Sequence, residues 1–321
     1  MRTIVVDPDR PDLDALAPAV EALRAGGLVA FPTETVYGLG ALALDATAAL
    51  RIFEAKGRPA DDPLIVHVRP HWDLGALFAE IDDVMRELIA THWPGPLTIV
   101  ARKQSSVPDV VTSGRDTVAV RAPNHPIAVA LLDLVGAPIA APSANRFSYV
   151  SPTTAAHVAA DLGGVIDVLV DGGPTSVGIE STIVAVEGGK VTLLRPGSVQ
   201  IGGAEAGDHA PRSAAPGRQD VHYSPDTRTV AMESGGRVSA AGRAGILIGY
   251  DDSLPPPQGW RFLSLGGRED LDGVARCLYT VLRQADRSGP EVIVVEFTGL
   301  PGVGEAIDDR IRRAAGGQTS I

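Results

Sequence analysis

Two basic residues, Lys56 and Arg58, stand two positions apart in the segment AKGRPADDPLIVHV, just before a proline and a predicted strand. Lysine is a rare choice in this chain, because 28 residues are lysine or arginine and the lysines are Lys56, Lys103 and Lys190. A lysine ammonium is a compact charge that can approach a reacting phosphate, whereas an arginine guanidinium holds two oxygens as a fork. The pair therefore indicates a polyphosphate ligand. The alternative is that both cations simply stabilise the carboxyl end of a helix through its dipole.

Other polar side chains stand at the ends of predicted strands, within apolar sequence. They lie in the segments FPTETVYGLG, TVAVRAP, APSAN, GIESTIV and LLRPGS. Polar groups gathered at strand ends of an α/β sheet usually line a ligand crevice. Each of these residues, taken alone, is explained as well by a turn, a helix cap or an ion pair. Together they indicate an anionic ligand of nucleotide size.

Several common catalytic motifs do not occur in the sequence. It has no GxxxxGK[ST] phosphate loop, no GxGxxG dinucleotide fingerprint and no GxSxG nucleophile segment. His67 and His71 lie four positions apart on a predicted strand and the loop after it, where a pocket or surface role is favoured over a metal site. The single cysteine, Cys277, excludes an intramolecular disulfide and a cysteine-based zinc site. We therefore expect no metal site built from protein ligands.

The whole chain has the composition of a folded protein of about two domains. It has 321 residues, of which 45% are hydrophobic and 21% charged. The net charge of −11 is a poor match for a polyanion, which disfavours nucleic acid as the main ligand. No apolar run has the length of a membrane span, and no basic-then-apolar leader is visible, so a cytoplasmic location without membrane association is expected.

Helical and strand patterns alternate over the first two hundred residues and predict an α/β domain. Its late strands follow one another too closely for helical crossovers, so the sheet should be mixed. One helix is predicted from Asp12, as its cap, to Gly26, and a second from Asp45 to Gly57. The segment FPTETVYGLG predicts a strand, a polar stretch and then a glycine-rich turn.

From about residue 202 the composition changes to Gly, Ala, Pro and Arg without periodicity, which predicts a linker. His222 and Tyr223 lie within this linker, although ring residues are unusual in an inert tether. A strand–helix–strand pattern follows and predicts a small Rossmann-like unit, with Cys277 as a small buried residue of its long helix. The predicted division is residues 1–205, 206–226 and 227–321.

Seven ordered motifs make the chain similar to the YrdC/Sua5 family. They are FPTETVYGLG, KGRPADDPLIVHV, WPGPLTIV, VAVRAPNHP, APSANRFSYVSPT, GIESTIV and LLRPGS. The linker APGRQDVHYSP and the tail GVGEAIDDRIRRAA resemble the two-domain Sua5 form. The resemblance implies a YrdC-like twisted mixed sheet with helices and a concave pocket, followed by a linker that acts as a lid and a Rossmann-like Sua5 domain.

The resemblance also implies the activity of an L-threonylcarbamoyladenylate synthase, a nucleotidyltransferase. Such an enzyme condenses L-threonine, bicarbonate and ATP to threonylcarbamoyl-AMP and releases pyrophosphate, which needs positioned charges but no covalent enzyme intermediate. The product feeds N6-threonylcarbamoyladenosine (t6A) at position 37 of tRNAs that decode codons starting with A. Mg2+ would accompany ATP without an all-protein cage. The implied partner is a tRNA threonylcarbamoyl transferase, and no stable binding of tRNA by this chain is expected.

Site residues follow from the matching motifs. Lys56 and Arg58 are implied to hold the triphosphate as the catalytic residues, with Pro59 ending the helix so that both turn into the pocket. The other implied nucleotide residues are Asp62, Thr117, Ser143, Asn145, Ser151, Arg195, His222 and Tyr223. The implied threonine residues are Thr35, His67, Arg121, Ala141 and Ser181, with Arg121 suited to the carboxylate and Ala141 offering its main chain.

Two features depart from the family pattern. The middle of the linker, residues 218–221, is less basic than in many members. The glycine that usually follows Ser148 is either replaced by Tyr149 or lies in a shifted register, so the pattern leaves the shape of this loop open. The linker residues that are retained are Pro216, Gly217, His222, Tyr223 and Pro225. The alternative function is a tRNA- or double-stranded-RNA-binding, or regulatory, YrdC-like protein without turnover. The net charge of −11 and the aromatic content of 4% argue against it.

Overall fold

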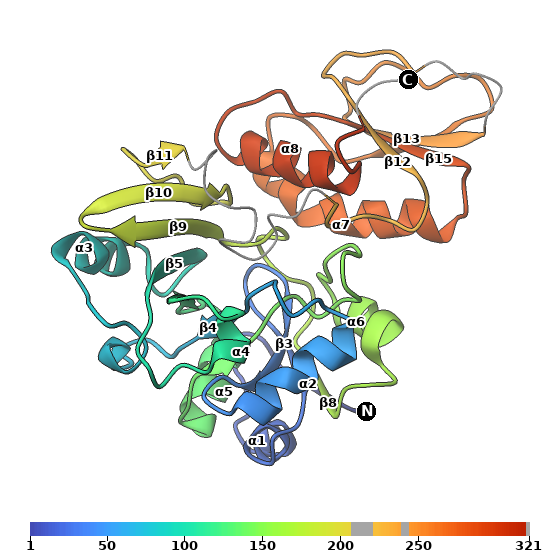
Figure 1. The fold of residues 1–321 in the computed structure, drawn as a ribbon. Helices are drawn as coiled ribbons and strands as arrows, with labels where there is room; N and C mark the ends of the chain where they lie inside the picture. The colour runs from blue at the N-terminus through green and yellow to red at the C-terminus, as the bar shows by residue number, and fades with distance from the viewer. Residues whose placement is uncertain (207–220, 239–243, 319–321) are drawn as a thin grey trace.

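The computed structural model describes residues 1–206, 221–238 and 244–318, which form two sheets with their helices (Figure 1). Linker residues 216–220, including Pro216, Gly217 and most of the less basic segment, lie outside the described residues. The strands of the first sheet are β1 (Arg2–Val5), β2 (Val29–Pro32), β3 (Tyr37–Leu42), β4 (Ile65–His67), β5 (Leu97–Arg102), β6 (Thr117–Arg121), β7 (Ile139–Ala140), β8 (Val168–Asp171), β9 (Thr182–Glu187), β10 (Lys190–Arg195) and β11 (Glu205–Ala206). Its helices are α1 (Ala17–Arg24), α2 (Ala46–Lys56), α3 (Asp83–His92), α4 (Asp109–Thr112), α5 (Pro126–Val135) and α6 (Ala155–Leu162), with a short 3-10 turn η1 (Leu74–Ala76).

The first sheet is mixed, as predicted. Its strand order is β1-β8-β2-β3-β7-β4-β6-β5-β9-β10-β11. β2 and β3 are antiparallel, β5 and β9 are parallel, and β9 and β10 form an antiparallel hairpin. The hairpin turns at Gly188 and Gly189, both with positive φ, which glycine adopts without the steric cost of a side chain. The short β9–β10 connection is the reason why these strands cannot be parallel.

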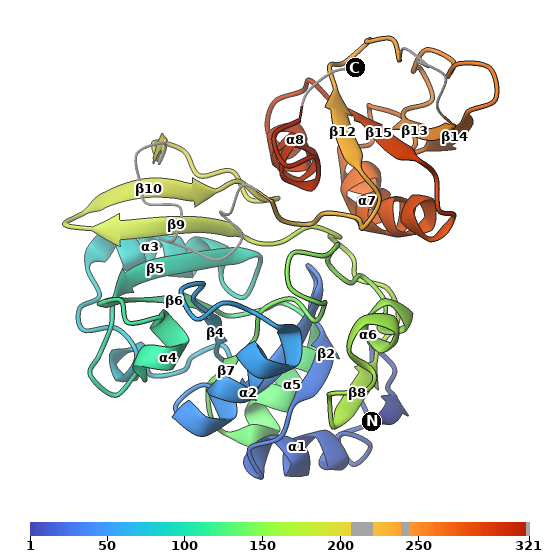
Figure 2. The same ribbon diagram turned by 45° about the vertical axis from the view of Figure 1, so that its right-hand side comes forward.

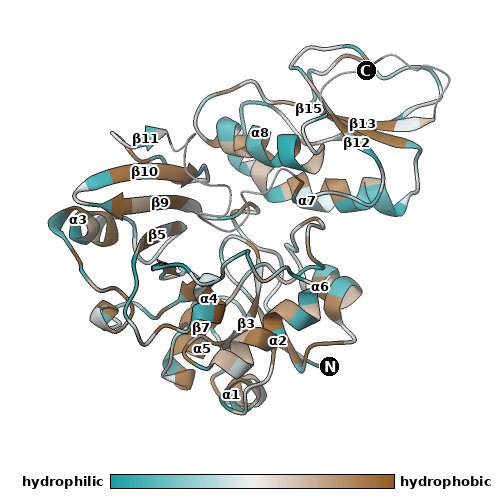
Figure 3. Ribbon diagram, viewed as in Figure 1, coloured by the Kyte–Doolittle hydropathy of each residue, from teal (hydrophilic) through white to brown (hydrophobic). Residues whose placement is uncertain are grey.

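Helices cover both faces of this sheet and bury two apolar cores. Side chains of α2, α3, α4 and α6 pack into one core, and those of α1 and α5 pack into the other. Figure 3 shows the hydrophobic colours along β9 and β10, as expected for strands that face a core. Two covered faces make the middle strands almost wholly apolar, so polar side chains are left for the strand ends.

Helix α1 begins later than predicted. It runs from Ala17 rather than from Asp12, and Asp12 instead accepts hydrogen bonds from the main chain of Asp14 and Ala15 in a turn. The reason is Pro18, which lacks an N–H group and whose ring collides with the carbonyl four residues earlier in a continuing helix. Proline is tolerated in the first turn, so the helix starts beside it. The second predicted helix is confirmed, with Asp45 as the N-cap of α2 and Gly57 as its left-handed C-cap.

The glycine-rich turn predicted after Thr35 is wrong, because Tyr37–Leu42 is strand β3. The turn is made by Thr33, Glu34 and Thr35 themselves, between β2 and β3. The glycines of β3 relieve crowding in the sheet: a Cβ at Gly40 would lie 2.7 Å from a ring carbon of Phe31 and 2.8 Å from Ile139. Glycine at this position lets β3 lie close to the side chains of its neighbours β2 and β7.

The second domain is a small α/β layer, in agreement with the Rossmann-like pattern. Its strands are β12 (Thr229–Met232), β13 (Gly245–Gly249), β14 (Arg261–Ser264) and β15 (Val292–Glu296), and its helices are α7 (Leu271–Arg287) and α8 (Val303–Ala314). The strands are parallel in the order β12-β15-β13-β14. Both helices lie between this sheet and the first domain (Figure 2). Cys277 of α7 is half-buried rather than buried, and its thiol lies 3.3 Å from the carbonyl oxygen of Leu265.

The two domains share an apolar core, to which Val36, Tyr149, Val150 and Ile179 of the first domain contribute. Tyr149 lies at this interface, and its hydroxyl donates to a carboxylate oxygen of Asp286 in α7 over 2.8 Å. Ser148 adopts a left-handed conformation, with φ of +62°, which is more usual for glycine. The departure at Tyr149 therefore provides an interdomain contact.

Candidate active site

Polar side chains from five strand ends and three loops meet in one cavity beneath helices α7 and α8. Its lining includes most of the sequence-predicted residues: Thr35, Arg58, His67, Arg121, Ala141, Ser143, Ser181, Arg195, His222 and Tyr223. The cavity encloses about 50 Å³, and one water needs roughly 10–15 Å³ of such space. A space of this size holds a few water molecules.

Arg121, the last residue of β6, is fixed by three groups around it. Its Nη2 lies 2.6 Å from a carboxylate oxygen of Glu34, its Nη1 donates to Thr35 over 2.8 Å, and its Nε donates to the carbonyl of Gly95 over 3.2 Å. A guanidinium has five N–H groups, so two remain for a ligand. The sequence did not assign Glu34 a role, although its place between two threonines in a strand connection was the available signal.

His67 lies opposite Arg121 in the register of β4 and β6. Burial, helped by the charge of Arg121, lowers the pKa of His67 to about 3, so its imidazole is neutral near pH 7. Its Nδ1 lies 3.3 Å from the carbonyl oxygen of Ile65. That nitrogen must carry the hydrogen, which leaves Nε2 as an acceptor for a ligand donor.

Ser181 and Arg195 form the wall supplied by β9 and β10. The Arg195 guanidinium donates to the main-chain oxygen of Ser181 over 2.9 Å and to its hydroxyl over 3.1 Å. Thr98 of β5 holds the same hydroxyl at 2.7 Å. Because β9 begins and β10 ends at this point, the hairpin brings residues fourteen positions apart into contact.

Lys56 ends α2, but it does not line the cavity. Its ammonium donates to the main-chain oxygens of Ser143 and Asn145 over 2.6 and 2.5 Å, with the side-chain oxygen of Asn145 at 3.3 Å. Burial, and next the charge of Arg58, lower the pKa of Lys56 well below its usual value. In this conformation Lys56 ties the helix end to the 143–145 loop, and its expected phosphate contact stays a prediction.

Arg58 reaches the cavity because Gly57 adopts a left-handed conformation and turns the chain out of the helix. Its guanidinium donates to the main-chain oxygens of Asp62 and Pro63 over 2.9 and 2.7 Å and forms an ion pair with the Asp62 carboxylate at 3.0 Å. Asp62 therefore orients Arg58 from behind rather than lining the cavity itself.

His222 and Tyr223 close the cavity from the side of the second domain. Their rings are 4.1 Å apart, and the Tyr223 ring stacks on Tyr279 of α7 at 5.7 Å. Among the described residues, neither Nδ1 of His222 nor the hydroxyl of Tyr223 has a hydrogen-bond partner. An unpaired buried polar group costs about 1–3 kcal/mol, so a ligand that pairs with either atom is favoured.

Besides Lys56 and Asp62, three other predicted residues lie outside this lining. Asn145 and Ser151 are buried behind it, where Ser151 donates to Glu180 over 2.6 Å and the Asn145 amide holds its own loop. Thr117 lies at the opposite end of β6 from Arg121, beside a separate cavity of about 810 Å³. The structure does not bring Thr117 to the other site residues.

Glu180, in contrast, was assigned no role from the sequence and lines the cavity. Burial favours a raised pKa for this carboxyl, but Arg310 and Arg195 and two hydrogen bonds outweigh it, so the pKa of Glu180 is lowered. Glu180 in the lining and Glu34 beside it are thus the carboxylate partners of two buried arginines, Arg310 and Arg121. No group of three or more His, Cys, Asp or Glu side chains in the described ranges could hold a metal ion.

The fold and the site define an α/β ligand-binding protein whose buried arginines and neutral imidazole suit a small anionic substrate. Residues 21–197 match the family described as "Telomere recombination", which groups Sua5, YciO and YrdC proteins, and residues 179–316 match "Threonylcarbamoyl-AMP synthase, C-terminal domain". The chain belongs to this Sua5/YrdC family, in its two-domain form, as the sequence motifs predicted.

Similar proteins cover almost the whole chain. The threonylcarbamoyl-AMP synthase of Pyrococcus abyssi is 42% identical over 317 residues, 92% of each chain. That of Bacillus subtilis is 39% identical over 329 residues, 94% of this chain and 93% of its own length. The crystal structure of P. abyssi Sua5 complexed with L-threonine superposes with a TM-score of 0.91, at 38% identity, over 100% of this chain and 99% of that one. The predicted YrdC-like fold is confirmed by this match. Within the described residues no helix is long and apolar enough to cross a membrane.

Proposed function

We propose that this protein is a threonylcarbamoyl-AMP synthase that condenses L-threonine, bicarbonate and ATP and releases pyrophosphate. The product is the precursor of t6A at position 37 of tRNAs. The observation that carries this proposal is the buried group of Arg121, His67 and Ser181 in a chain similar over its full length to a Sua5 protein solved with L-threonine. No nucleophilic side chain is needed, because the substrates themselves supply the reacting groups.

L-Threonine would bind at the β4–β6 end of the cavity. Two N–H groups of Arg121 remain for its carboxylate, while Glu34 keeps the guanidinium from turning. The neutral His67 can accept a hydrogen bond through Nε2 without adding a charge that would repel the substrate ammonium. Ser181 and the main chain of Ala141 complete this side.

ATP would bind at the end of α2. Arg58 and Arg195 face the cavity, and Lys56 stands behind the 143–145 loop, so Lys56 must exchange one of its carbonyl partners for a phosphate oxygen. Bicarbonate takes up a proton and loses water to give CO2, and the threonine amine adds to this CO2 and loses a proton to form a carbamate. The carbamate oxygen then bonds to the α-phosphorus of ATP, and the bond from the α-phosphorus to the bridging oxygen breaks, so that this oxygen leaves with pyrophosphate. Fixed cations near the phosphates stabilise the charge that moves onto the leaving pyrophosphate.

Mg2+ would travel with the triphosphate. The described residues offer no acidic or histidine cluster for a metal, which suits an ion held by phosphate oxygens and water. Residues 1–205 would form the catalytic domain, 206–226 the lid and 227–321 the Sua5 domain. The protein would act in the cytoplasm and hand its product to a tRNA threonylcarbamoyl transferase, without stable tRNA binding of its own.

The test is pyrophosphate release from ATP and Mg2+, with L-threonine and bicarbonate omitted in turn. Release that requires both substrates is expected. Release with neither would indicate a nucleotide hydrolase, and ATP binding without release would indicate the regulatory or RNA-binding alternative.

A matched pair of variants tests the threonine site. Arg121→Gln should raise the KM for threonine by about 100-fold, because a desolvated charge pair is lost. Arg86→Gln, on the exposed face of α3, removes the same charge away from the cavity and should leave KM unchanged. Equal effects of both substitutions would contradict the assignment.

A further inference from the structure

Glu180 lines the cavity and is also hydrogen-bonded to residues of the second domain. Its carboxylate accepts three side-chain hydrogen bonds: from Ser151 over 2.6 Å, from Tyr279 over 2.8 Å and from Arg310 over 2.9 Å. Ser151 belongs to the first domain, whereas Tyr279 lies on α7 and Arg310 on α8. Glu180 is only 6% exposed, so these partners are the groups that keep its charge satisfied.

Arg310 holds the main chain on both sides of the cavity wall. Its Nη1 donates to the carbonyl of Pro196 over 2.8 Å, and its Nη2 to the carbonyl of Glu180 over 3.4 Å. Glu180 immediately precedes Ser181, and Pro196 immediately follows Arg195. One fully buried guanidinium therefore connects the start of β9 and the end of β10 at the two residues that face the substrates.

The same guanidinium supports the lid. Its central carbon lies 5.5 Å from the ring centre of Tyr223, which stacks on Tyr279. The main-chain N–H of His222 donates to the carbonyl of Arg313 one turn further along α8. The lid residues thus rest on the helices that carry Arg310 and Tyr279.

We propose that Arg310 is a positioning residue for the synthase reaction: it fixes Glu180 and Pro196, and through them Ser181 and Arg195, so that the second domain completes the substrate cavity. This inference rests on the proposed function for its kinetic consequence. It gives a role in substrate affinity to α8, none of whose residues is among the site residues predicted from the sequence. Arg310 reaches no substrate itself.

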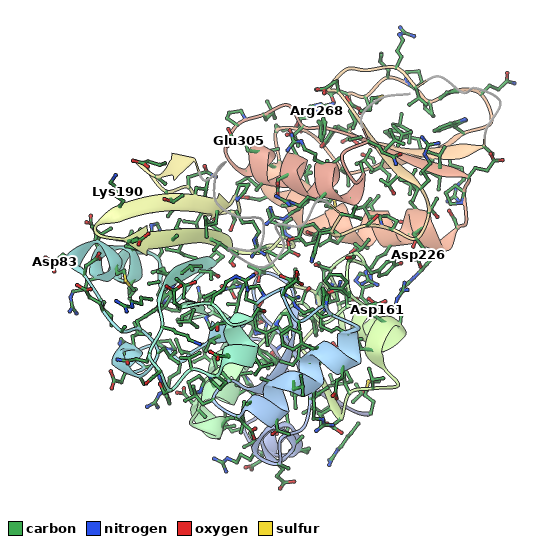
Figure 4. All side chains as sticks on the ribbon, in the orientation of Figure 1. Asp83, Asp161, Lys190, Asp226, Arg268 and Glu305 are labelled. Carbon is green, nitrogen blue, oxygen red and sulfur yellow. The ribbon has the colours of Figure 1, made fainter. Side chains whose placement is uncertain are left out.

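A control pair is available at the same interface. Asp161 of α6 pairs with Arg283 of α7 at 2.6 Å, and both side chains are buried (Figure 4 labels Asp161). This ion pair also joins the two domains, but neither residue lines the cavity. Asp161→Asn therefore weakens the interface without touching the Glu180–Pro196 connection.

The experiment compares Arg310→Gln with Asp161→Asn in the full-length protein. Arg310→Gln should raise the KM for both L-threonine and ATP by about tenfold or more, with a smaller fall in kcat, and Asp161→Asn should change neither KM by more than about twofold. Arg310→Lys keeps the charge but replaces a planar fork of five N–H donors by three donors on one nitrogen, so it should restore only part of the affinity. If Arg310→Gln does not fold, Arg310→Lys alone carries the comparison. Equal kinetics of the Arg310 and Asp161 variants in an active protein would overturn the inference.

Amide hydrogen exchange separates this inference from the proposed function. Peptides containing Glu180, Ser181 and Thr182 should exchange faster in Arg310→Gln than in Asp161→Asn, whatever the catalytic activity. A wild-type protein without threonine-dependent pyrophosphate release would refute the function, and the exchange result would still decide the positioning role. Identical exchange of this segment in both variants would refute the positioning role.

Discussion

The buried histidine of the cavity should make the protein sensitive to mild acid. Burial and Arg121 lower the pKa of His67 to about 3, against 6.5 for an exposed histidine. Between these values the unfolded chain binds a proton that the folded chain does not. The stabilising contribution is thus fully present above pH 6.5 and is lost as the pH falls toward 3.

The size of this loss follows from the shift. Each pH unit below 6.5 costs about 1.4 kcal/mol, so the free energy of unfolding should fall by about 2 kcal/mol at pH 5. A domain of ordinary stability has about 5–15 kcal/mol in total, so this loss is measurable. His67→Asn removes the titrating group and keeps a donor for the carbonyl of Ile65.

The assay is urea unfolding of the wild-type protein and of His67→Asn at several pH values from 5 to 7.5. The difference in unfolding free energy between the two proteins should change by about 2 kcal/mol across this range, in favour of the variant at low pH. His71→Asn is the control, because it makes the same substitution at a histidine whose side chain is exposed and lies outside the cavity. A wild-type-minus-variant difference that does not change with pH would refute the argument that His67 is buried in its neutral form.

Three further predictions concern the nucleotide site, the lid and the sheet. Lys56→Ala and Arg58→Ala should each lower turnover about 100-fold or more while reducing folded yield far less, and equal losses of activity and of folded protein, measured by circular dichroism, would indicate a structural pair. His222→Ala or Tyr223→Ala should speed product release or ATP hydrolysis several-fold in rapid-mixing experiments, and unchanged kinetics would leave the lid without support. Gly40→Ala places a methyl group 2.7 Å from a ring carbon of β2 and should cost about 1–3 kcal/mol, which thermal unfolding would reveal; a variant as stable as its parent would show that the sheet relaxes there.

Local patterns in the sequence were sufficient for elements that are defined by their own residues. The long helix predicted around Cys277 is α7, because its apolar spacing and its cap, Asp270, lie within one segment. The start of α1 was missed because the apolar spacing before Pro18 continued past the position at which a proline stops a helix. Lining residues such as Arg121, Ser181 and Arg195 could be located because strand ends place polar groups next to apolar runs. Their roles toward threonine and phosphate came from the family resemblance and stay predictions.

Contacts between distant segments left no such pattern. Glu180 lies 130 positions from Arg310, and nothing in either segment predicts the other. The sequence also could not show that the donors of Lys56 are used by the 143–145 loop, since that depends on how α2 packs against the end of β7. Three-dimensional packing, rather than local propensity, decides these contacts.

Pairing of charges explains how an acidic protein can hold an anionic substrate. With a net charge of −11 the protein as a whole does not attract phosphates, so recognition must come from individual donors. Arg58 has Asp62 and Arg121 has Glu34 as buried carboxylate partners, at 3.0 and 2.6 Å. Each carboxylate orients its arginine and offsets part of the cost of burying an isolated cation. The affinity for the substrate then depends on the arginine N–H groups that these ion pairs leave unused. A carboxylate or phosphate can bond to these groups only where its oxygens match their fixed orientation.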